Sequence, residues 1–297
     1  MPPTTGFWLP PFHPDADALL LSGLLVALFA ATIWEARRAG VRYPVGGARI
    51  AAFLGGALTV AIASSWPIHD LSEGYLFSVH MVQHMLFTFV AAPLLLWGIP
   101  TWLLESALEP PPVRRVIRFC ANPLVAFILY NGGVGLTHIP EVTDVILRNH
   151  PVHYLVHAFL MASSMLVWFP VLRSVPGLPR LSYPLQMGYL FVQSIVPTVI
   201  YAPLTLSGDV AYQFYGEAPR IWGVNAITDQ QMAGLLMKIG GGLIIWGWMT
   251  VIFFRWFARS DAGTLGGEFA PLDELTPKSA VRAADELLRT NPNQRGR

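Results

Sequence analysis

Two pairs of histidines, each pair four residues apart, are the side chains whose type and spacing could do chemistry. His80 and His84 open one apolar stretch of the sequence, and His153 and His157 open another. Because four residues make about one turn of an α-helix, both imidazoles of a pair project from the same helix face. Neutral imidazoles are ligands of copper, zinc and iron. The spacing therefore predicts that the two pairs face each other and form a metal site.

The composition places these pairs in a membrane protein. Of the 297 residues, 54% are hydrophobic and only 12% are charged. Several runs reach the ~20 apolar residues that a transmembrane helix needs, so we expect an all-α, polytopic protein embedded in the lipid bilayer. The net charge of +1 gives no reason to expect a nucleic-acid partner. The single cysteine, Cys120, excludes a disulfide framework and any CxxC motif.

Seven transmembrane helices fit the pattern of apolar runs. We expect an external N-terminal lead-in (1–16), a seven-helix transmembrane domain (17–257) and a cytoplasmic C-terminal tail (258–297). Pro93 predicts a kink in the third span. The spans are expected at residues 17–34, 48–66, 75–98, 122–137, 152–172, 183–206 and 229–257.

The distribution of arginine predicts the orientation. The loops after spans one, three and five contain four, three and two arginines, whereas the loops after spans two, four and six contain none, one and one. Positively charged loops stay on the cytoplasmic side. We therefore expect the N-terminus outside, the C-terminus in the cytoplasm, and all eight histidines on the external half.

Other histidines and their neighbours allow more than one interpretation. A single histidine near the end of a span is commonly an interfacial or hydrogen-bonded residue. His138 fits this description, but it is also a plausible fifth ligand. Asp229 could be a metal ligand or the cap of its own helix. Thioethers favour Cu(I), but Met81 and Met85 also fit as packing residues. A haem held between one histidine of span three and one of span five is an alternative to copper.

Lys238 lies deep in the last predicted span, where a charged side chain needs a partner. We expect it to donate to backbone carbonyls or glycine-rich neighbours, or to make a proton or partner contact. No nucleophile elbow, Walker loop, HExxH motif or dinucleotide-binding turn is present. The protein is therefore not expected to be an enzyme.

Several short motifs occur in order along the sequence. They are His80-Met-Val-Gln-His84, Ala92-Pro93-Leu, Gly98-Ile-Pro100, His138-Ile-Pro140 with Asp144, His153-x-x-x-His157 with Trp168-Phe-Pro170, and Asp229-Gln-Gln-x-x-Gly234. Together these motifs resemble one known family, the multi-span cytochrome c oxidase assembly factors of the CtaG kind, named after the caa-type oxidase. The resemblance covers roughly residues 50–257. Lys238 departs from the family pattern, in which this position is commonly apolar.

The resemblance implies an accessory factor for the assembly of a haem–copper oxidase in the bacterial cytoplasmic (inner) membrane. Its partner would be an oxidase subunit, and it would support delivery of copper from an external-face site to the oxidase copper centre. The family's motif positions fall on His80, His84, His138, His153, His157 and Asp229. A haem-binding membrane protein and a membrane scaffold without metal remain alternatives, and the oligomeric state is open.

Overall fold

The computed structural model describes residues 6–40, 45–173 and 175–265, and the regular structure in this part of the chain is all helix, with no strand. The all-α fold class predicted above is confirmed for these residues. The elements are α1 (Ala16–Arg38), α2 (Gly47–Ala63), α3 (Ile68–Gly74), α4 (Phe77–Met85), the π-helical η1 (Leu86–Ala91), α5 (Ala92–Gly98), α6 (Thr101–Ala107), α7 (Pro111–Cys120), α8 (Pro123–Thr137), α9 (Pro140–Leu147), α10 (His150–Leu172), α11 (Tyr183–Ile195), α12 (Thr198–Leu206), α13 (Gln213–Glu217), α14 (Ala226–Leu235), the π-helical η2 (Leu236–Gly240) and α15 (Gly241–Leu265).

Five helices are long and apolar enough to cross a membrane, and two bent helix pairs raise the number to seven if each pair counts as one span. The five are α1, the continuous helix from α4 to α5, α10, α11 with α12, and α14 to α15. The bent pairs are α2 with α3, at 45°, and α7 with α8, at 69°.

Short helices occupy the segments that the sequence pattern predicts only as loops. They are α3, α6, α7, α9 and α13. Pro111 and Pro140 stand in the first turns of α7 and α9, where the missing N–H of proline is harmless. The predicted tail (258–297) begins inside α15, and its residues 266–297 lie outside the described part of the chain.

Pro93 acts on the third span through a widened turn. Proline cannot donate a helical hydrogen bond, and the ladder immediately before it is π-helical, with the Ala92 N–H donating to Phe87 O, five residues back. The helix then continues as α5 to Gly98. The widened turn begins two residues after His84, so it separates the histidine-bearing turns from the apolar remainder of the span.

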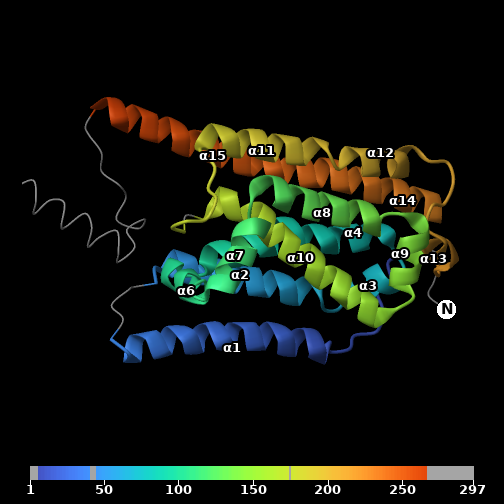
Figure 1. Cartoon of the computed structure of the whole chain (residues 1–297). Coiled ribbons are helices and arrows are strands. Elements are labelled where there is room, and N and C mark those ends of the chain that lie inside the picture. The colour runs from blue at the N-terminus through green and yellow to red at the C-terminus, as the bar shows by residue number, and fades with distance from the viewer. Residues whose placement is uncertain (1–5, 41–44, 174, 266–297) are drawn as a thin grey trace, which may run out of the picture.

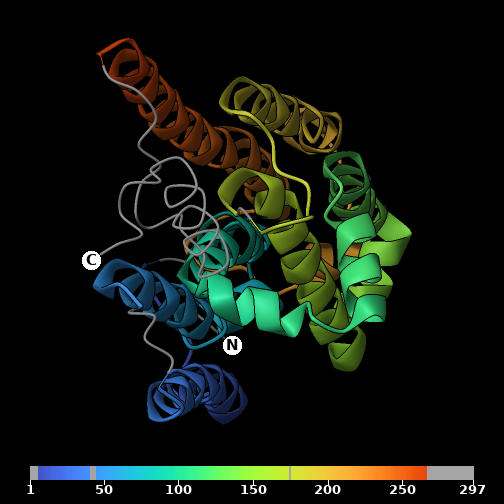
Figure 2. The ribbon, with the colours of Figure 1, turned by 60° about the vertical axis from the view of Figure 1, so that its left-hand side comes forward.

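Figure 1 shows an elongated bundle in which α1 lies along one edge and α11, α12, α14 and α15 lie along the opposite edge, with α4, α8 and α10 between them. In the rotated view of Figure 2, α1 remains at the rim, beside α2. Many large apolar side chains on the outer helices are exposed, including Leu20 and Leu24 of α1. Such surfaces are expected where helices face lipid.

The two ends of the bundle differ in chemistry. One end, here called the histidine end, contains α3, α9, α13 and the beginnings of α4 and α10 (Figure 1). The other, here called the arginine end, contains α6, α7, the beginning of α11 and the last turns of α15 (Figure 1).

Candidate metal centre

The two predicted histidine pairs are brought together at the histidine end. The four ligand nitrogens, one each from His80, His84, His153 and His157, all lie within 4.8 Å of one another. The Nε2 atoms of His84 and His157 are 3.1 Å apart. An ion with four nitrogen ligands at ~2.0 Å in tetrahedral geometry has N–N distances of ~3.3 Å. Small side-chain rotations would therefore suffice to close these four imidazoles, here called the histidine cluster, around one ion.

The surrounding helices bury the cluster and shield it from water. His80 and His153 expose only 5% and 3% of their surfaces. The ring centroids of these two residues are 5.2 Å apart, with the rings nearly parallel. Buried imidazole nitrogens without partners are costly, so the cluster needs a ligand or a proton network to satisfy it.

A small cavity of about 20 Å³ adjoins the cluster. It is lined by His80, His84, His138, His153 and Met81, among other residues. Three of the lining side chains have a buried nitrogen with no hydrogen-bond partner, namely Nδ1 of His80, Nε2 of His138 and Nε2 of His153. A volume of ~15 Å³ is enough for one water-sized occupant. The cavity thus combines space for a single ion with nitrogen atoms that lack any other partner.

His138 and His157 occupy different sides of this arrangement. His157 belongs to the compact cluster but does not line the cavity, whereas His138 lines the cavity but lies outside the compact group. His138 Nδ1 is bound to Val134 O at 2.7 Å, which leaves Nε2 as its available atom. His80, His84 and His153 are common to both sets, and they are the centre of the candidate site.

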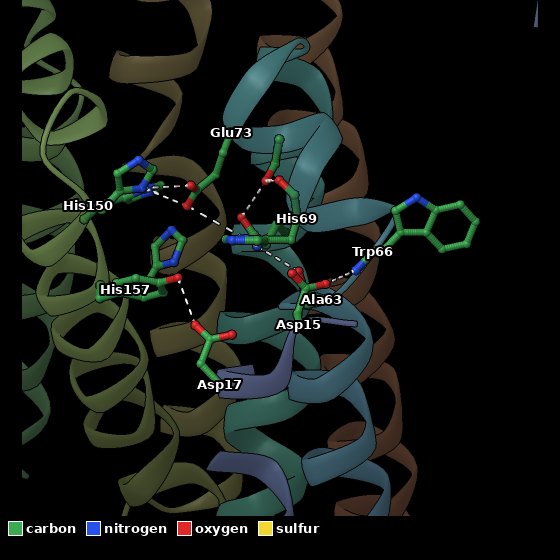
Figure 3. A network of polar contacts seen from close by, with 12 residues as sticks. Asp15, Asp17, Ala63, Trp66, His69, Glu73, His150 and His157 are labelled. Carbon is green, nitrogen blue, oxygen red and sulfur yellow. Dashed lines mark hydrogen bonds and ion pairs between the residues drawn. The ribbon is translucent and has the colours of Figure 1, made fainter. Parts of the chain in front are cut away.

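Glu73 is the functional candidate that sequence reasoning missed. Its Oε1 lies 3.0 Å from His153 Nδ1, and its Oε2 lies 3.3 Å from His150 Nδ1. Figure 3 shows Glu73 reaching from α3 toward His150 on the neighbouring helix. A carboxylate that accepts from Nδ1 of a neutral histidine leaves Nε2 free to bind metal and fixes the ring orientation. The available signal was the i, i+4 spacing of His69 and Glu73 before the third span, where Nδ1 of His69 lies 3.8 Å from Oε1 of Glu73.

Asp229 holds the helix that carries the first histidine pair. Its Oδ2 accepts from the Phe77 N–H at 2.6 Å and its Oδ1 accepts from the Ser78 N–H at 3.0 Å. These are orphan donors in the first turn of α4. The sequence allows two roles for Asp229, that of a metal ligand and that of a cap on its own helix. In the structure Asp229 caps a different helix, and it is not among the groups that could hold a metal in the described part of the chain.

Two other buried side chains fix α4 against its neighbours. Gln83 donates to Ala63 O at 2.7 Å and accepts from Ser72 Oγ at 3.1 Å. Tyr215 donates to Ser72 O at 2.6 Å, and its ring packs on Phe77. These contacts join α2, α3, α4 and α13 around the first histidine pair.

The methionines differ in their placement. Met81 is buried in the core beside Phe77 and also lines the small cavity. The Met85 methyl group instead approaches Gly240 in η2, which is a packing contact. Met85 is therefore a packing residue, whereas Met81 is placed both to pack in the core and to contact an ion in the cavity.

Lys238 does not belong to the centre. Its Nζ donates to Thr198 Oγ1 at 2.7 Å and to Ser194 O at 3.4 Å. The Ser194 carbonyl lies in the last turn of α11, where Pro197 interrupts the helix and backbone acceptors are left over. Of the roles considered for this lysine, donation to a backbone carbonyl is the one that the structure contains.

A second group of possible ligands lies at the histidine end, outside the cluster. Nε2 of His13 is 2.9 Å from Oδ2 of Asp70, and Nδ1 of His13 is 3.5 Å from Asp15. Asp15 also accepts from the Trp66 N–H at 2.6 Å, a contact drawn in Figure 3. His13 is exposed and the contacts join the N-terminal segment to α3, so a structural role accounts for them.

One protein family and several bacterial proteins are similar to this chain. The family of cytochrome c oxidase caa3 assembly factors (Caa3_CtaG) matches residues 27–259. Uncharacterised proteins of Mycobacterium bovis and Mycobacterium tuberculosis are each 28% identical over 238 residues, which is 73% of this chain and 35% of theirs. An uncharacterised protein of Mycobacterium leprae is 26% identical over 293 residues, or 92% of this chain and 43% of its own.

The chain thus spans about a third to two fifths of the length of these relatives. No solved structure matches it. The family match covers the segment from α1 to α15 and includes all of the candidate ligands, and on this basis the chain belongs to the cytochrome c oxidase caa3 assembly factor family.

Proposed function

We propose that this protein holds a copper ion where the histidine cluster meets its adjoining cavity, and that it supports delivery of this ion to the copper centre of a haem–copper oxidase. One observation carries the proposal: four convergent imidazoles adjoin a cavity of about 20 Å³ whose lining includes three unpartnered, buried nitrogens. The family supplies the oxidase assembly role. Copper is the cargo in this scheme, and the protein is an accessory factor rather than an enzyme.

The donor set favours copper over zinc. Imidazole nitrogen suits both metals, but a neighbouring thioether, here Met81, adds a preference for Cu(I). Zinc sites more often include thiolate or carboxylate ligands. Cys120 ends α7, in a segment apart from the cluster, and Glu73 is bound to ring nitrogens instead of pointing a free oxygen at the cavity.

Access to the cluster runs through Glu73 and His150. The His150 side chain is 71% exposed, whereas that of His153 is 4% exposed, and Glu73 contacts both. Copper arriving at the surface would meet His150 first and pass to the buried ligands by exchange of one ligand at a time. A few neutral ligands, without thiolates, would release the ion again to a partner with a stronger donor set.

The proposal places the protein in the bacterial cytoplasmic membrane, with seven spans, the N-terminus outside and the C-terminus in the cytoplasm. The arginine-rich and histidine-rich ends of the bundle support this orientation, because arginine-rich loops remain in the cytoplasm. The histidine cluster would then open toward the external side, where it could meet a membrane-embedded oxidase subunit.

A haem centre has less support from the geometry. The ring centroids within the cluster are 4.3 to 5.8 Å apart, and the rings already contact one another. A porphyrin inserted between α4 and α10 would have to displace this packing. Copper fits the existing arrangement with small rotations.

The test is metal analysis of the purified full-length protein after loading with Cu(I), comparing wild type with His80→Ala/His84→Ala. The control is His13→Ala, which removes an exposed histidine outside the cluster. We expect about one copper per wild-type and control chain and a loss of most of it in the double variant. Equal copper in all three proteins would refute the proposal. A Soret band in the wild-type protein that disappears in the double variant would show that the site binds haem and not copper.

Rescue of a deletion strain separates copper handling from a metal-free scaffold. We expect the double variant to reach the membrane at the wild-type level but to leave the oxidase without its copper centre. Full oxidase assembly with the double variant would support the scaffold instead.

A further inference from the structure

The arginine end contains a second, larger cavity that the copper proposal does not use. Its volume is about 420 Å³, and five arginines contribute to its wall. They come from three separate parts of the bundle: α2, the segment between α10 and α11, and α15. The five are Arg49, Arg173, Arg180, Arg255 and Arg259.

Arg173 is the most deeply placed of these side chains, with 2% of its surface exposed. Its Nη1 donates to Trp97 O at 3.5 Å and its Nη2 donates to Thr101 Oγ1 at 3.2 Å, while its Nε has no partner. No ion pair to Arg173 or Arg255 occurs within the described residues. A buried guanidinium held by neutral oxygens alone is an incomplete arrangement.

The positive charges of Arg49 and Arg173 oppose each other. Burial, together with the charge of Arg49, lowers the pKa of Arg173 to about 10, although the charge of Glu105 acts in the opposite direction. Arg49 donates to Trp97 O and Ile99 O, both at 3.3 Å, so Arg49 and Arg173 share the same carbonyl. An anion between the guanidinium groups would remove the repulsion and satisfy the free donor.

The remaining wall of the cavity indicates which kind of molecule has the anionic group that binds there. Trp97, Tyr183 and Trp248 line it together with apolar residues of α15, and Val251 of α15 is 49% exposed. The cavity thus lies where spanning helices end and aromatic rings accompany them, as at a membrane interface. Basic pockets between helices at this depth suit lipid headgroups, whereas a soluble anion would need no apolar rim.

We propose that this cavity binds the phosphodiester headgroup of an anionic phospholipid, with the acyl chains lying against the exposed apolar side of α15. The guanidinium groups of Arg173 and Arg255 donate to the phosphate oxygens, and Arg173 provides the buried floor of the site. The site is independent of the histidine cluster, since it lies at the opposite end of the bundle. It would tie α2, α10, α11 and α15 together at the arginine end.

The test measures lipid binding by the full-length protein in a zwitterionic detergent-lipid mixture. Purified protein is titrated with phosphatidylglycerol, phosphatidylcholine or inorganic phosphate, and the thermal midpoint is followed. Lipid that remains bound is identified by native mass spectrometry. The variants are Arg173→Gln and Arg255→Gln. Arg115→Gln/Arg118→Gln, which removes two exposed arginines of α7 at the same end, is the control.

For wild type and the control we expect stabilisation by phosphatidylglycerol at a much lower concentration than by phosphatidylcholine. Each arginine removed from the cavity should raise the phosphatidylglycerol concentration at half-effect about tenfold, the equivalent of one charge-assisted hydrogen bond. Because Arg173 also holds the beginning of α6, the exposed Arg255→Gln provides the variant that leaves the packing intact.

Two results would overturn the proposal. If Arg255→Gln and Arg173→Gln bind phosphatidylglycerol as wild type does, the cavity is not the lipid site. If inorganic phosphate stabilises wild type as strongly as phosphatidylglycerol does, the site takes a free anion and the lipid assignment is wrong.

Discussion

Oε1 of Glu73 lies 3.0 Å from Nδ1 of His153, although the two side chains come from helices separated by more than one transmembrane span. The contact directs Nε2 of His153 away from the carboxylate, and this Nε2 is one of the unpartnered nitrogens. In the proposed copper site, Glu73 would therefore position a histidine and not act as a ligand itself.

The first prediction concerns Glu73→Gln. The amide keeps the shape of the side chain but loses the negative charge that orients His153. We therefore expect copper affinity to fall ~10- to 100-fold, the usual effect of losing a group that hydrogen-bonds to a metal-binding histidine. The measurement is competition with a Cu(I) chelator of known affinity. Glu141→Gln, which alters an exposed carboxylate at the same end of the bundle, is the matched control. Unchanged affinity in Glu73→Gln would remove the positioning role.

The second prediction separates the two possible positions of copper. An ion in the compact cluster uses His157, whereas an ion in the adjoining cavity uses His138 and is close to the Met81 thioether. Because the unpartnered nitrogens all belong to cavity-lining histidines, we expect His138→Ala to reduce copper affinity more than His157→Ala does. X-ray absorption at the copper edge adds a second readout, since a sulfur ligand would be detected only for the cavity position. A larger loss in His157→Ala, without sulfur, would place the ion in the compact cluster.

Helix periodicity was sufficient to predict the histidine pairs, because residues four apart must share a face once the stretch is helical. The proximity of Glu73 to His153 was not predictable in this way, since it depends on how α3 turns after α2. The same holds for the arginines: their loops followed from the sequence, but the convergence of Arg49 and Arg173 on one carbonyl depends on tertiary packing.

The third prediction concerns the capping of α4 by Asp229. In Asp229→Asn one carboxylate oxygen becomes an NH₂ group, which cannot accept from the first turn of α4. We expect the free energy of unfolding to fall by about 1–3 kcal/mol, the range for loss of a hydrogen bond to a buried charged group. Thermal unfolding in detergent measures it, with the exposed Asp209→Asn as control. Copper stoichiometry of the folded variant should stay near that of wild type, and a complete loss would instead indicate that Asp229 is a ligand.

The fourth prediction is a pH dependence at the histidine end. Arg148 Nη2 lies 2.7 Å from Glu217 Oε2, joining the end of α9 to α13. The hydrogen bond and the charge of Arg148 lower the pKa of Glu217 from its ordinary value of 4.5. The pair therefore contributes its full stabilisation above the ordinary pKa, which Glu217 has in the unfolded chain. The contribution disappears as the pH falls through the lowered pKa of the folded state.

Arg148→Gln tests whether the stabilisation by this pair is lost as the pH falls. Its thermal midpoint should lie slightly below that of wild type at neutral pH, because the pair is exposed and screened, and the two midpoints should converge as Glu217 becomes protonated. A difference that persists in acid would mean that Arg148 acts through another contact, such as its position near the Phe214 ring.

The fifth prediction concerns the close approach of α2 and α5 at Gly98. A Cβ atom at Gly98 would lie 2.6 Å from the backbone nitrogen of Phe53 and 2.7 Å from its Cα, and backbone atoms cannot rotate away. Gly98→Ala should therefore separate the two helices and lower the free energy of unfolding by about 1–3 kcal/mol, the range for overpacking. Gly242→Ala is the matched control, because a Cβ there meets nothing within 4 Å. Since Arg49 of α2 donates to Trp97 O beside Gly98, the same variant should also weaken phosphatidylglycerol binding at the arginine end. Equal stability of the two glycine variants would show that α2 and α5 are not in close contact at this point.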